Sequence, residues 1–253
     1  MTSNADNSVL FLDTLNLGPD LTWVLKRMKS AHERGEVGEN VLRVEDFRRW
    51  AHVLNLLFAD TPGQSLLDVG IGAGQFVNAA AHSGHFSKVT GLDREKHSSF
   101  KALTARFGYV QKSLIMPQQP KMRHDIVTCM ECLEHIKTMA LQTAIDNLRY
   151  LARKRLIITV PFREPLPLST YHFQHFDEER LAALFPDARI SYLACGRRLQ
   201  WALVDIHVPL VEQSREVSPP LAGAVIGVEP DDEDESAAPA ASDQTVTRQT
   251  LRT

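Results

Sequence analysis

The 253-residue sequence has few cysteines, no long apolar segment and little net charge. Its three cysteines are too few for the disulfide framework of a small secreted domain. No apolar run is long enough to cross a membrane, and the first residues lack the basic and apolar segments of a signal peptide. We therefore expect a cytoplasmic protein.

The net charge of −3 is unevenly distributed along the chain. Residues 212–253 contain nine acidic and three basic residues, and the rest of the chain carries a net charge of +3. A body this weakly basic lacks the basic stripe of an RNA-binding protein, so we do not expect a nucleic-acid partner. The segment after residue 211 is dominated by proline, alanine, serine and acids, a composition that predicts a disordered acidic tail.

The most informative segment of the chain is Ser65–Gly74, with the sequence SLLDVGIGAG. Its short apolar run has no helical period and predicts a buried strand, which ends at glycines that allow a tight turn. The pattern after it predicts a helix over residues 75–83, with Gly84 as its C-terminal cap. A strand, a glycine turn and a helix in this order open a nucleotide-binding α/β unit.

The spacing of the glycines indicates which nucleotide binds. A dinucleotide-binding turn has the pattern G-x-G-x-x-G, whereas here Asp68 is followed by Gly70, Gly72 and Gly74. This D-x-G-x-G-x-G pattern resembles motif I of the class I methyltransferases that depend on S-adenosylmethionine (SAM). An acidic residue suits a ligand that carries an amino group and a sulfonium but no phosphate. The resemblance implies SAM as the cofactor and these four residues as part of its binding site.

A second acidic residue supports the same cofactor. Residues 88–93 predict the next strand, and Asp93 ends this strand roughly 20 residues after the glycine turn. A carboxylate at this position can accept hydrogen bonds from both ribose hydroxyls. Residues 94–107 then predict a helix with apolar side chains on one face, so Asp93 also lies where an acid stabilises a helix N-terminus.

The remaining pattern predicts alternating strands and helices. Helices are expected over residues 44–58 and 138–151, and strands over 109–111, 124–130, 155–160, 188–194 and 199–208. This order resembles the Rossmann-like class I methyltransferase fold, an α/β fold with a mostly parallel seven-stranded sheet, a terminal antiparallel hairpin and helices on both faces. We divide the chain into a partly helical N-terminal extension (1–43), a SAM-binding domain (44–211) and the disordered tail (212–253).

Residues 127–135, VTCMECLEH, resemble motif IV of small-molecule O-methyltransferases, with close similarity to those that methylate quinone precursors. In an open parallel sheet, ligands bind beyond the carboxyl ends of the strands, where Met130–His135 would lie. We therefore expect Met130 to contact the cofactor. Cys129 and Cys132 form a C-x-x-C pair without a second pair of ligands, so we interpret them as buried small residues.

Methyl transfer to a hydroxyl also requires removal of the hydroxyl proton, which a histidine or a carboxylate can accept. We predict Glu131, His135 and His175 as the catalytic residues, and Glu134 and His172 are further candidates beside them. Two other interpretations stay open. Glu134 can serve only to orient His135 or to cap the next helix, and His135 can simply pack beside the cofactor.

The sequence thus predicts a SAM-dependent O-methyltransferase that acts on a small molecule, such as a sugar, a phenol or a quinone precursor, with a histidine as general base. Two alternatives stay open. Glu131-x-x-Glu134-His135 with a later histidine resembles the metal-binding set of small-RNA 3′-terminal methyltransferases, which would make the chain a metal-dependent RNA 2′-O-methyltransferase, although we predict no metal. The other alternative is a binding protein that keeps the fold without turnover, and the unbroken motif I counts against it.

Overall fold

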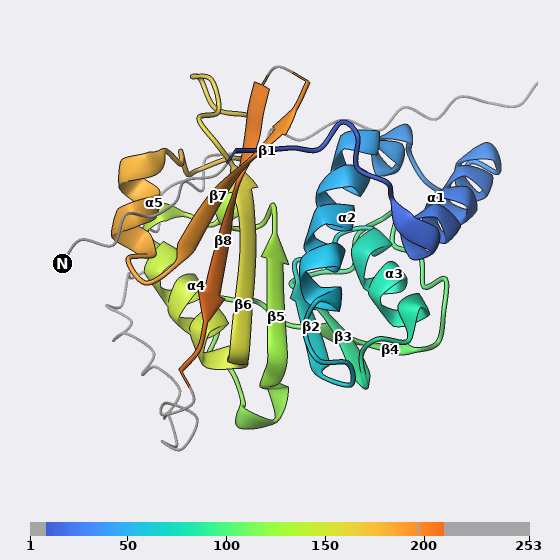
Figure 1. Cartoon of the computed structure of the whole chain (residues 1–253), viewed down its shortest axis with the longest axis horizontal. Helices are drawn as coiled ribbons and strands as arrows, with labels where there is room; N and C mark the ends of the chain where they lie inside the picture. Colours follow the sequence, from blue (N-terminus) through green and yellow to red (C-terminus); the bar gives the residue numbers. More distant parts are fainter. Residues whose placement is uncertain (1–8, 197, 210–253) are drawn as a thin grey trace, which may run out of the picture. The chain divides into compact units, whose positions relative to one another are not determined.

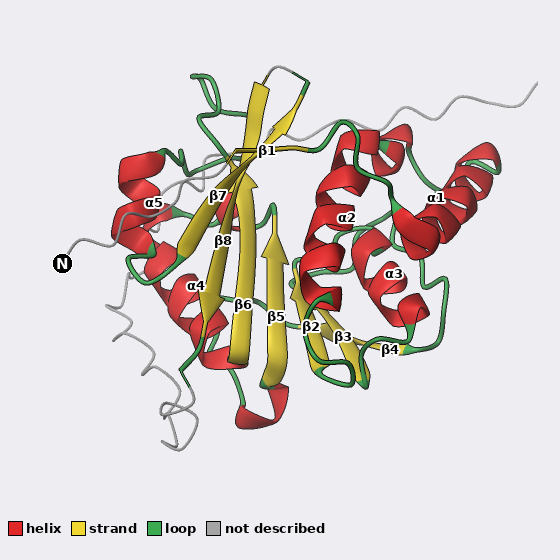
Figure 2. Ribbon diagram, viewed as in Figure 1, coloured by secondary structure: helices red, strands yellow, loops and turns green. Residues whose placement is uncertain are grey.

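An eight-stranded sheet forms the centre of the computed structural model, which describes residues 9–196 and 198–209 (Figures 1 and 2). Its strand order is β1-β7-β8-β6-β5-β2-β3-β4. Strand β8 runs antiparallel to β6 and β7, and the other neighbouring strands are parallel. The strands are β1 (Val9–Phe11), β2 (Ser65–Val69), β3 (Lys88–Asp93), β4 (Phe107–Gln111), β5 (His124–Met130), β6 (Ala152–Pro161), β7 (Arg189–Cys195) and β8 (Arg198–His207).

Helices cover both faces of this sheet (Figure 2). Leu66 belongs to the hydrophobic cluster under α1–α3, and its neighbour Leu67 belongs to the cluster under α4 and α5, because successive side chains of a strand point to opposite faces. The helices are α1 (Gly18–Glu33), α2 (Val44–Phe58), α3 (Gln75–Ser83), α4 (Thr138–Leu151) and α5 (Glu178–Leu184), with short 3₁₀ helices η1 (Glu39–Leu42), η2 (Pro120–Met122) and η3 (Leu133–His135). No helix among the described residues is both long and apolar enough to span a membrane.

The predicted fold class is confirmed, and the predicted strand count is one too low. Strand β1 pairs in parallel with β7 at the edge of the sheet, and its three residues are too few to show a strand pattern in the sequence. The segment that we assigned to an N-terminal extension also contributes to the core, since Leu21, Val24 and Met28 of α1 are completely buried. The tail from residue 212 lies outside the described residues, and the domain boundaries stay a prediction.

The helix predicted over residues 94–107 is wrong, because that segment has turns and irregular backbone before β4. Hydrogen bonds from the completely buried side chain of Asn78 hold this segment. Its Nδ2 atom donates to the carbonyl oxygens of Gly74 and Lys101 at 2.7 Å each, and its Oδ1 atom accepts from the N–H of Leu103 at 2.8 Å. The apolar side chains that suggested one helical face pack onto the α1–α3 cluster from this irregular segment.

The order in which the chain adds strands to the sheet reverses between β2 and β5, and the site lies at this point. The chain runs outward from β2 through β3 and β4, and it then returns to the other side of β2 to form β5. The connections after β2 and β5 therefore leave the carboxyl edge in opposite directions, which opens the crevice where ligands bind in such sheets. Gly70, Gly72 and Gly74 have φ values of 77°, 52° and 88°, which glycine adopts without strain.

We expect Asn78→Ala to lower the free energy of unfolding by about 2–4 kcal/mol, because it leaves the carbonyl of Lys101 and the N–H of Leu103 without their buried partner. Urea unfolding measures this change. Gln142→Ala is a matched control: within the described part of the chain, the exposed side chain of Gln142 bonds only to the carboxylate of Asp146, and its loss should change stability by less than about 0.5 kcal/mol. Equal effects of the two substitutions would contradict the role of Asn78.

Candidate functional site

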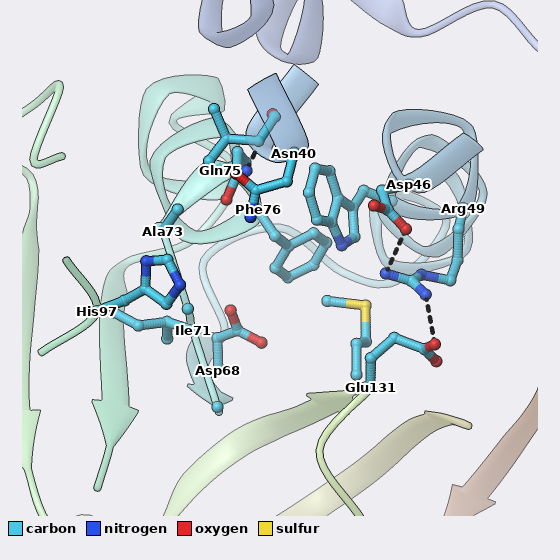
Figure 3. Close-up of a pocket in the computed structure, with 15 residues that line it drawn as sticks. Asn40, Asp46, Arg49, Asp68, Ile71, Ala73, Gln75, Phe76, His97 and Glu131 are labelled. Carbon is cyan, nitrogen blue, oxygen red and sulfur yellow. Dashed lines mark hydrogen bonds and ion pairs between the residues drawn. The ribbon is translucent and has the colours of Figure 1, made fainter. Parts of the chain in front are cut away.

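A cavity of about 200 Å³ opens at the carboxyl edge of the sheet, between the glycine turn and helix α2 (Figure 3). Its lining comes from α2 and the residues before it, from β2, the glycine turn and the start of α3, from His97, and from the end of β5. Gly74 lies beside it as the N-cap of α3, and Asp93 lies at the end of β3. Five residues that we predicted for the site line the cavity: Asp68, Gly70, Gly72, Met130 and Glu131.

Asp93 holds the glycine turn in place. Its Oδ2 atom accepts a hydrogen bond from the N–H of Gly72 at 3.0 Å, whereas its Oδ1 atom makes no hydrogen bond with the described residues. The turn also needs glycine for space, because a Cβ atom on Gly70 would lie 3.0 Å from both Cβ and Sγ of Cys132. Asp93 thus contacts the turn at Gly72, and Cys132 packs closely against it at Gly70. The other carboxylate oxygen of Asp93 stays available to a ligand.

Asp68 lies in the floor of the cavity and is almost completely buried. Burial raises the pKa of Asp68 to about 7, the charge of Asp93 adds to this effect, and a hydrogen bond from Thr128 opposes it. Thr128 Oγ1 donates that bond to Asp68 Oδ1 at 2.8 Å. Near neutral pH, Asp68 therefore exists in both protonation states, and a cationic ligand would favour the ionised one.

Arg49 is a buried cation in the wall of the cavity, and our sequence reasoning missed it. It is 3% exposed, and its guanidinium forms ion pairs with Asp46 at 3.3 Å and Glu131 at 3.1 Å (Figure 3). The guanidinium also lies over the ring of Trp201, 4.9 Å from its centre. Its Nε atom is buried and has no hydrogen-bond partner among the described residues. An unpaired buried donor in a cavity wall is suited to bind an anionic group of a ligand.

Glu131 is fully engaged within the protein. Its Oε2 atom accepts a hydrogen bond from Trp201 Nε1 at 3.0 Å, and its Oε1 atom accepts one from Thr159 Oγ1 at 3.3 Å. Burial raises the pKa of Glu131, and the charge of Arg49 opposes this shift. The residue has a φ of 50°, a left-handed value that is uncommon outside glycine and is often found at functional sites. These contacts hold the side chain of Glu131 in the wall of the cavity.

A second group of polar side chains lies at the same edge of the sheet. Glu134, His135 and His172 each offer one possible ligand atom, and these atoms lie within 4.8 Å of one another. We call these residues the Glu134 cluster. Glu134 and His135 belong to η3 directly after β5, and His172 lies in the connection between β6 and α5. Among the described residues, neither His175 nor Glu131 joins a group of this kind.

Both histidines of the Glu134 cluster are oriented through Nδ1. The Nδ1 atom of His135 lies 3.0 Å from the carbonyl oxygen of Tyr171, and the Nδ1 atom of His172 lies 2.6 Å from Oε2 of Glu164. Both partners are acceptors, so each Nδ1 atom donates its hydrogen bond, and Nε2 is the ring nitrogen that can act as an acceptor. Glu164 was not among our predicted residues, since nothing in the sequence connects it with a histidine eight residues later.

Glu134 adds a buried carboxyl group with one unpaired oxygen to the cluster. The residue is 1% exposed, and its Oε2 atom has no hydrogen-bond partner among the described residues. Burial raises the pKa of Glu134 well above its usual value, and the nearby charge of Glu131 adds to this shift. Burial therefore favours the neutral form of this carboxyl group, whereas a cation or a strong donor at the cluster would favour its ionised form.

A family model described as a methyltransferase domain matches residues 42–189, which is more than half of the chain. The chain therefore belongs to this methyltransferase family, and it is a SAM-dependent enzyme. No curated protein sequence matches the chain at a significant level.

Solved structures of methyltransferases share the fold. Magnesium protoporphyrin IX methyltransferase from Synechocystis PCC 6803 with bound SAH is 19% identical, with a TM-score of 0.53 over 76% of this chain and 100% of that chain. N-methyltransferase NodS from Bradyrhizobium japonicum WM9 is 15% identical, with a TM-score of 0.53 over 66% of this chain and 98% of that one. The small RNA methyltransferase HEN1 is 14% identical, with a TM-score of 0.55 over 68% of this chain and 25% of its own length.

The raised pKa of Asp68 predicts how stability depends on pH. Because the folded state binds the proton more tightly than the unfolded state, the stabilising contribution is present below the unfolded pKa and is lost as the pH rises through about 7. Asp68→Asn removes the charge and keeps an acceptor for Thr128. We expect the variant to match the wild type near pH 4 and to exceed its unfolding free energy by ~2–4 kcal/mol near pH 8.

Asp125→Asn is a control, because the pKa of Asp125 is shifted in the opposite direction to that of Asp68. Burial of Asp125 favours its neutral form, but hydrogen bonds from Ser65 and Lys154 outweigh burial and lower the pKa of Asp125. Its loss should destabilise the protein near neutral pH and have little effect in acid. Urea unfolding at both pH values measures the two variants. A pH-independent effect of Asp68→Asn would contradict the raised pKa.

Proposed function

We propose that the enzyme transfers the methyl group of SAM to a hydroxyl group of a small molecule and that the Glu164–His172 pair removes the hydroxyl proton. The observation that supports this most is the 2.6 Å contact between Glu164 Oε2 and His172 Nδ1, which leaves Nε2 as the basic atom. A carboxylate in this position fixes the tautomer of the imidazole and stabilises the imidazolium that forms. The base is thus His172, beside the predicted His135, whose ring centre lies 4.9 Å away.

The unpaired groups of the cavity match the polar groups of SAM. We assign the ribose hydroxyls to the free oxygen of Asp93 and the amino group to Asp68. The carboxylate of the methionine part suits the unpaired Nε atom of Arg49. Met130 lines the cavity at the end of β5, three residues before η3 begins. We expect the sulfonium next to it. The cofactor then lies along the carboxyl edge, and its methyl group faces the Glu134 cluster.

Alignment and proton removal are the main requirements of this reaction. The hydroxyl oxygen attacks the methyl carbon in line with the carbon–sulfur bond, and the electron pair of that bond moves to sulfur, which leaves S-adenosylhomocysteine. The hydroxyl proton passes to Nε2 of His172. In the neutral form that burial favours, the carboxyl group of Glu134 can donate a hydrogen bond to the acceptor molecule and help to orient it.

Exposed apolar side chains near His172 favour an apolar or aromatic acceptor. Tyr171 is 74% exposed, Phe173 is 48% exposed, and Leu166 in the same connection is 75% exposed. The backbone of this segment is tied to the cluster, because the N–H of Phe173 donates to the carbonyl oxygen of Glu134 at 2.7 Å. Aromatic side chains in such a position can stack on a planar ring. A phenol or a quinone precursor therefore suits the site better than a sugar does.

We expect His172→Ala to lower kcat by about 10²–10⁴-fold, because general-base catalysis contributes rate factors of this size. Glu164→Gln should also lower kcat, since a neutral amide fixes the tautomer of the imidazole and stabilises the imidazolium less well than a carboxylate does. The measurement is transfer of labelled methyl groups to hydroxylated aromatic compounds between about pH 5.5 and 8.5. His175→Ala is the matched control, and loss of activity in that variant alone would return the role to the predicted His175.

A metal-dependent RNA 2′-O-methyltransferase is a second candidate, and the Glu134 cluster favours it. One carboxylate and two imidazoles suit a divalent transition metal, and the two acceptors at Nδ1 supply the outer hydrogen bonds that metal-binding histidines need. Glu134, His135 and His172 would hold the ion, which would lower the pKa of a ribose hydroxyl when bound.

Chelation separates the two candidates. With His172 as a simple base, activity should be unchanged after treatment with EDTA, and Glu134→Gln should keep most of the rate because Gln preserves a hydrogen-bonding group of similar size. Loss of activity in EDTA that manganese or magnesium restores, together with inactivity of Glu134→Gln, would support the metal-dependent reaction on RNA instead.

A further inference from the structure

We propose that a second cavity, between helix α1 and the segment at residues 101–103, binds a phosphorylated ligand. This cavity measures about 470 Å³ and shares no lining residue with the cofactor cavity. Lys26, Arg27, Arg34 and Lys101 line it, and Glu36 is the one acidic residue of its described lining. The lining therefore carries a net charge of +3, in a protein whose total charge is −3.

The carboxylates near this cavity act on Arg34 and Lys101, and they leave the exposed cations Lys26 and Arg27 without a paired counter-charge among the described residues: Glu36 lies in the lining, and Glu33 acts on Arg34 from outside it. Glu36 pairs with Arg34 through two contacts at 2.7 and 3.2 Å, and with Lys101 at 3.0 Å. Lys26 makes no hydrogen bond or ion pair with the described residues, and neither does Arg27. Cations that share a cavity without counter-charges repel one another, so an anionic ligand would bind with a gain in electrostatic energy.

The guanidinium of Arg27 is already held in position. It lies over the ring of Trp23, 4.8 Å from the ring centre, and the imidazole of His82 stacks on Trp23 with a centre distance of 4.1 Å. His82 is fixed in turn by Asp20, whose carboxylate lies 2.7 Å from its Nδ1 atom. Because Trp23 already stacks on one ring and carries a cation, it offers little surface to a planar base. We therefore expect the cations of the lining to bind the charged group of the ligand, with little contribution from a planar base.

The charge and the donor geometry favour phosphate over carboxylate. A guanidinium binds two phosphate oxygens at once, and lysines add point charges around them. A ligand with one carboxylate would balance only a third of the charge, whereas adjoining phosphoryl groups match it. Either a small phosphorylated molecule or the backbone of a nucleic acid supplies this chemistry. The inference is independent of the proposed acceptor, because it uses no residue of the Glu134 cluster.

The test is calorimetric titration of the full chain with tripolyphosphate at low salt, about 50 mM. We expect one saturable site whose affinity falls at least about tenfold in the double variant Lys26→Gln/Arg27→Gln, because both uncompensated cations are lost. Lys29→Gln is the matched control, since Lys29 is an exposed cation of the same helix that does not line the cavity. Affinity for SAM should be equal in all three proteins.

A second titration identifies the source of the phosphate. A single-stranded uridine oligonucleotide of about ten nucleotides should bind more tightly than tripolyphosphate if the cavity takes a nucleic-acid backbone, and more weakly if it takes a small phosphorylated molecule. Both outcomes require that the double variant weakens binding and that Lys29→Gln does not. The inference fails if neither probe binds saturably at low salt, or if the double variant binds either probe as the wild type does.

Discussion

The buried guanidinium of Arg49 joins the walls of the cofactor cavity. It contacts Asp46 on its own helix, Glu131 at the end of β5 and the ring of Trp201 on β8. A buried charge costs several kcal/mol unless it is well paired, so the position of α2 over the glycine turn depends on these contacts. They also hold Glu131, with its left-handed backbone, as a partner of Arg49 and Trp201.

The carboxyl edge of the sheet has two parts, which differ in how their buried carboxyl groups are hydrogen-bonded. Burial raises the pKa of both Asp68 and Glu134, but Asp68 bonds to Thr128, whereas one oxygen of Glu134 has no partner among the described residues. Asp68 belongs with the glycine turn, where a cationic cofactor would favour its ionised form. Glu134 lies beside two oriented histidines, where a hydroxyl group or a metal ion would complete its bonding. We interpret the first part as the cofactor site and the second as the acceptor site.

The ends of two helices, which depend on neighbouring residues, were predicted correctly from the sequence, whereas the local periodicity of residues 94–107 was misleading. Gly84 ends α3 with a φ of 69°, and Asp177 caps α5 by accepting from the N–H of Arg180 at 2.8 Å. Features that depend on distant partners were not predicted. Arg49 finds Glu131 more than eighty residues later, and the choice of His172 over His175 depends on where Glu164 lies in the folded chain. Composition alone could not distinguish these two histidines.

The most direct measurement of the central claim is a crystal structure of the protein with bound S-adenosylhomocysteine. We expect its ribose hydroxyls within hydrogen-bonding distance of Asp93, its amino group close to Asp68 and its carboxylate against Arg49. We also expect its sulfur to face His172 past the side chain of Met130. A ligand bound away from the glycine turn, or one whose sulfur points away from the Glu134 cluster, would contradict both the cofactor assignment and the proposed site of methyl transfer.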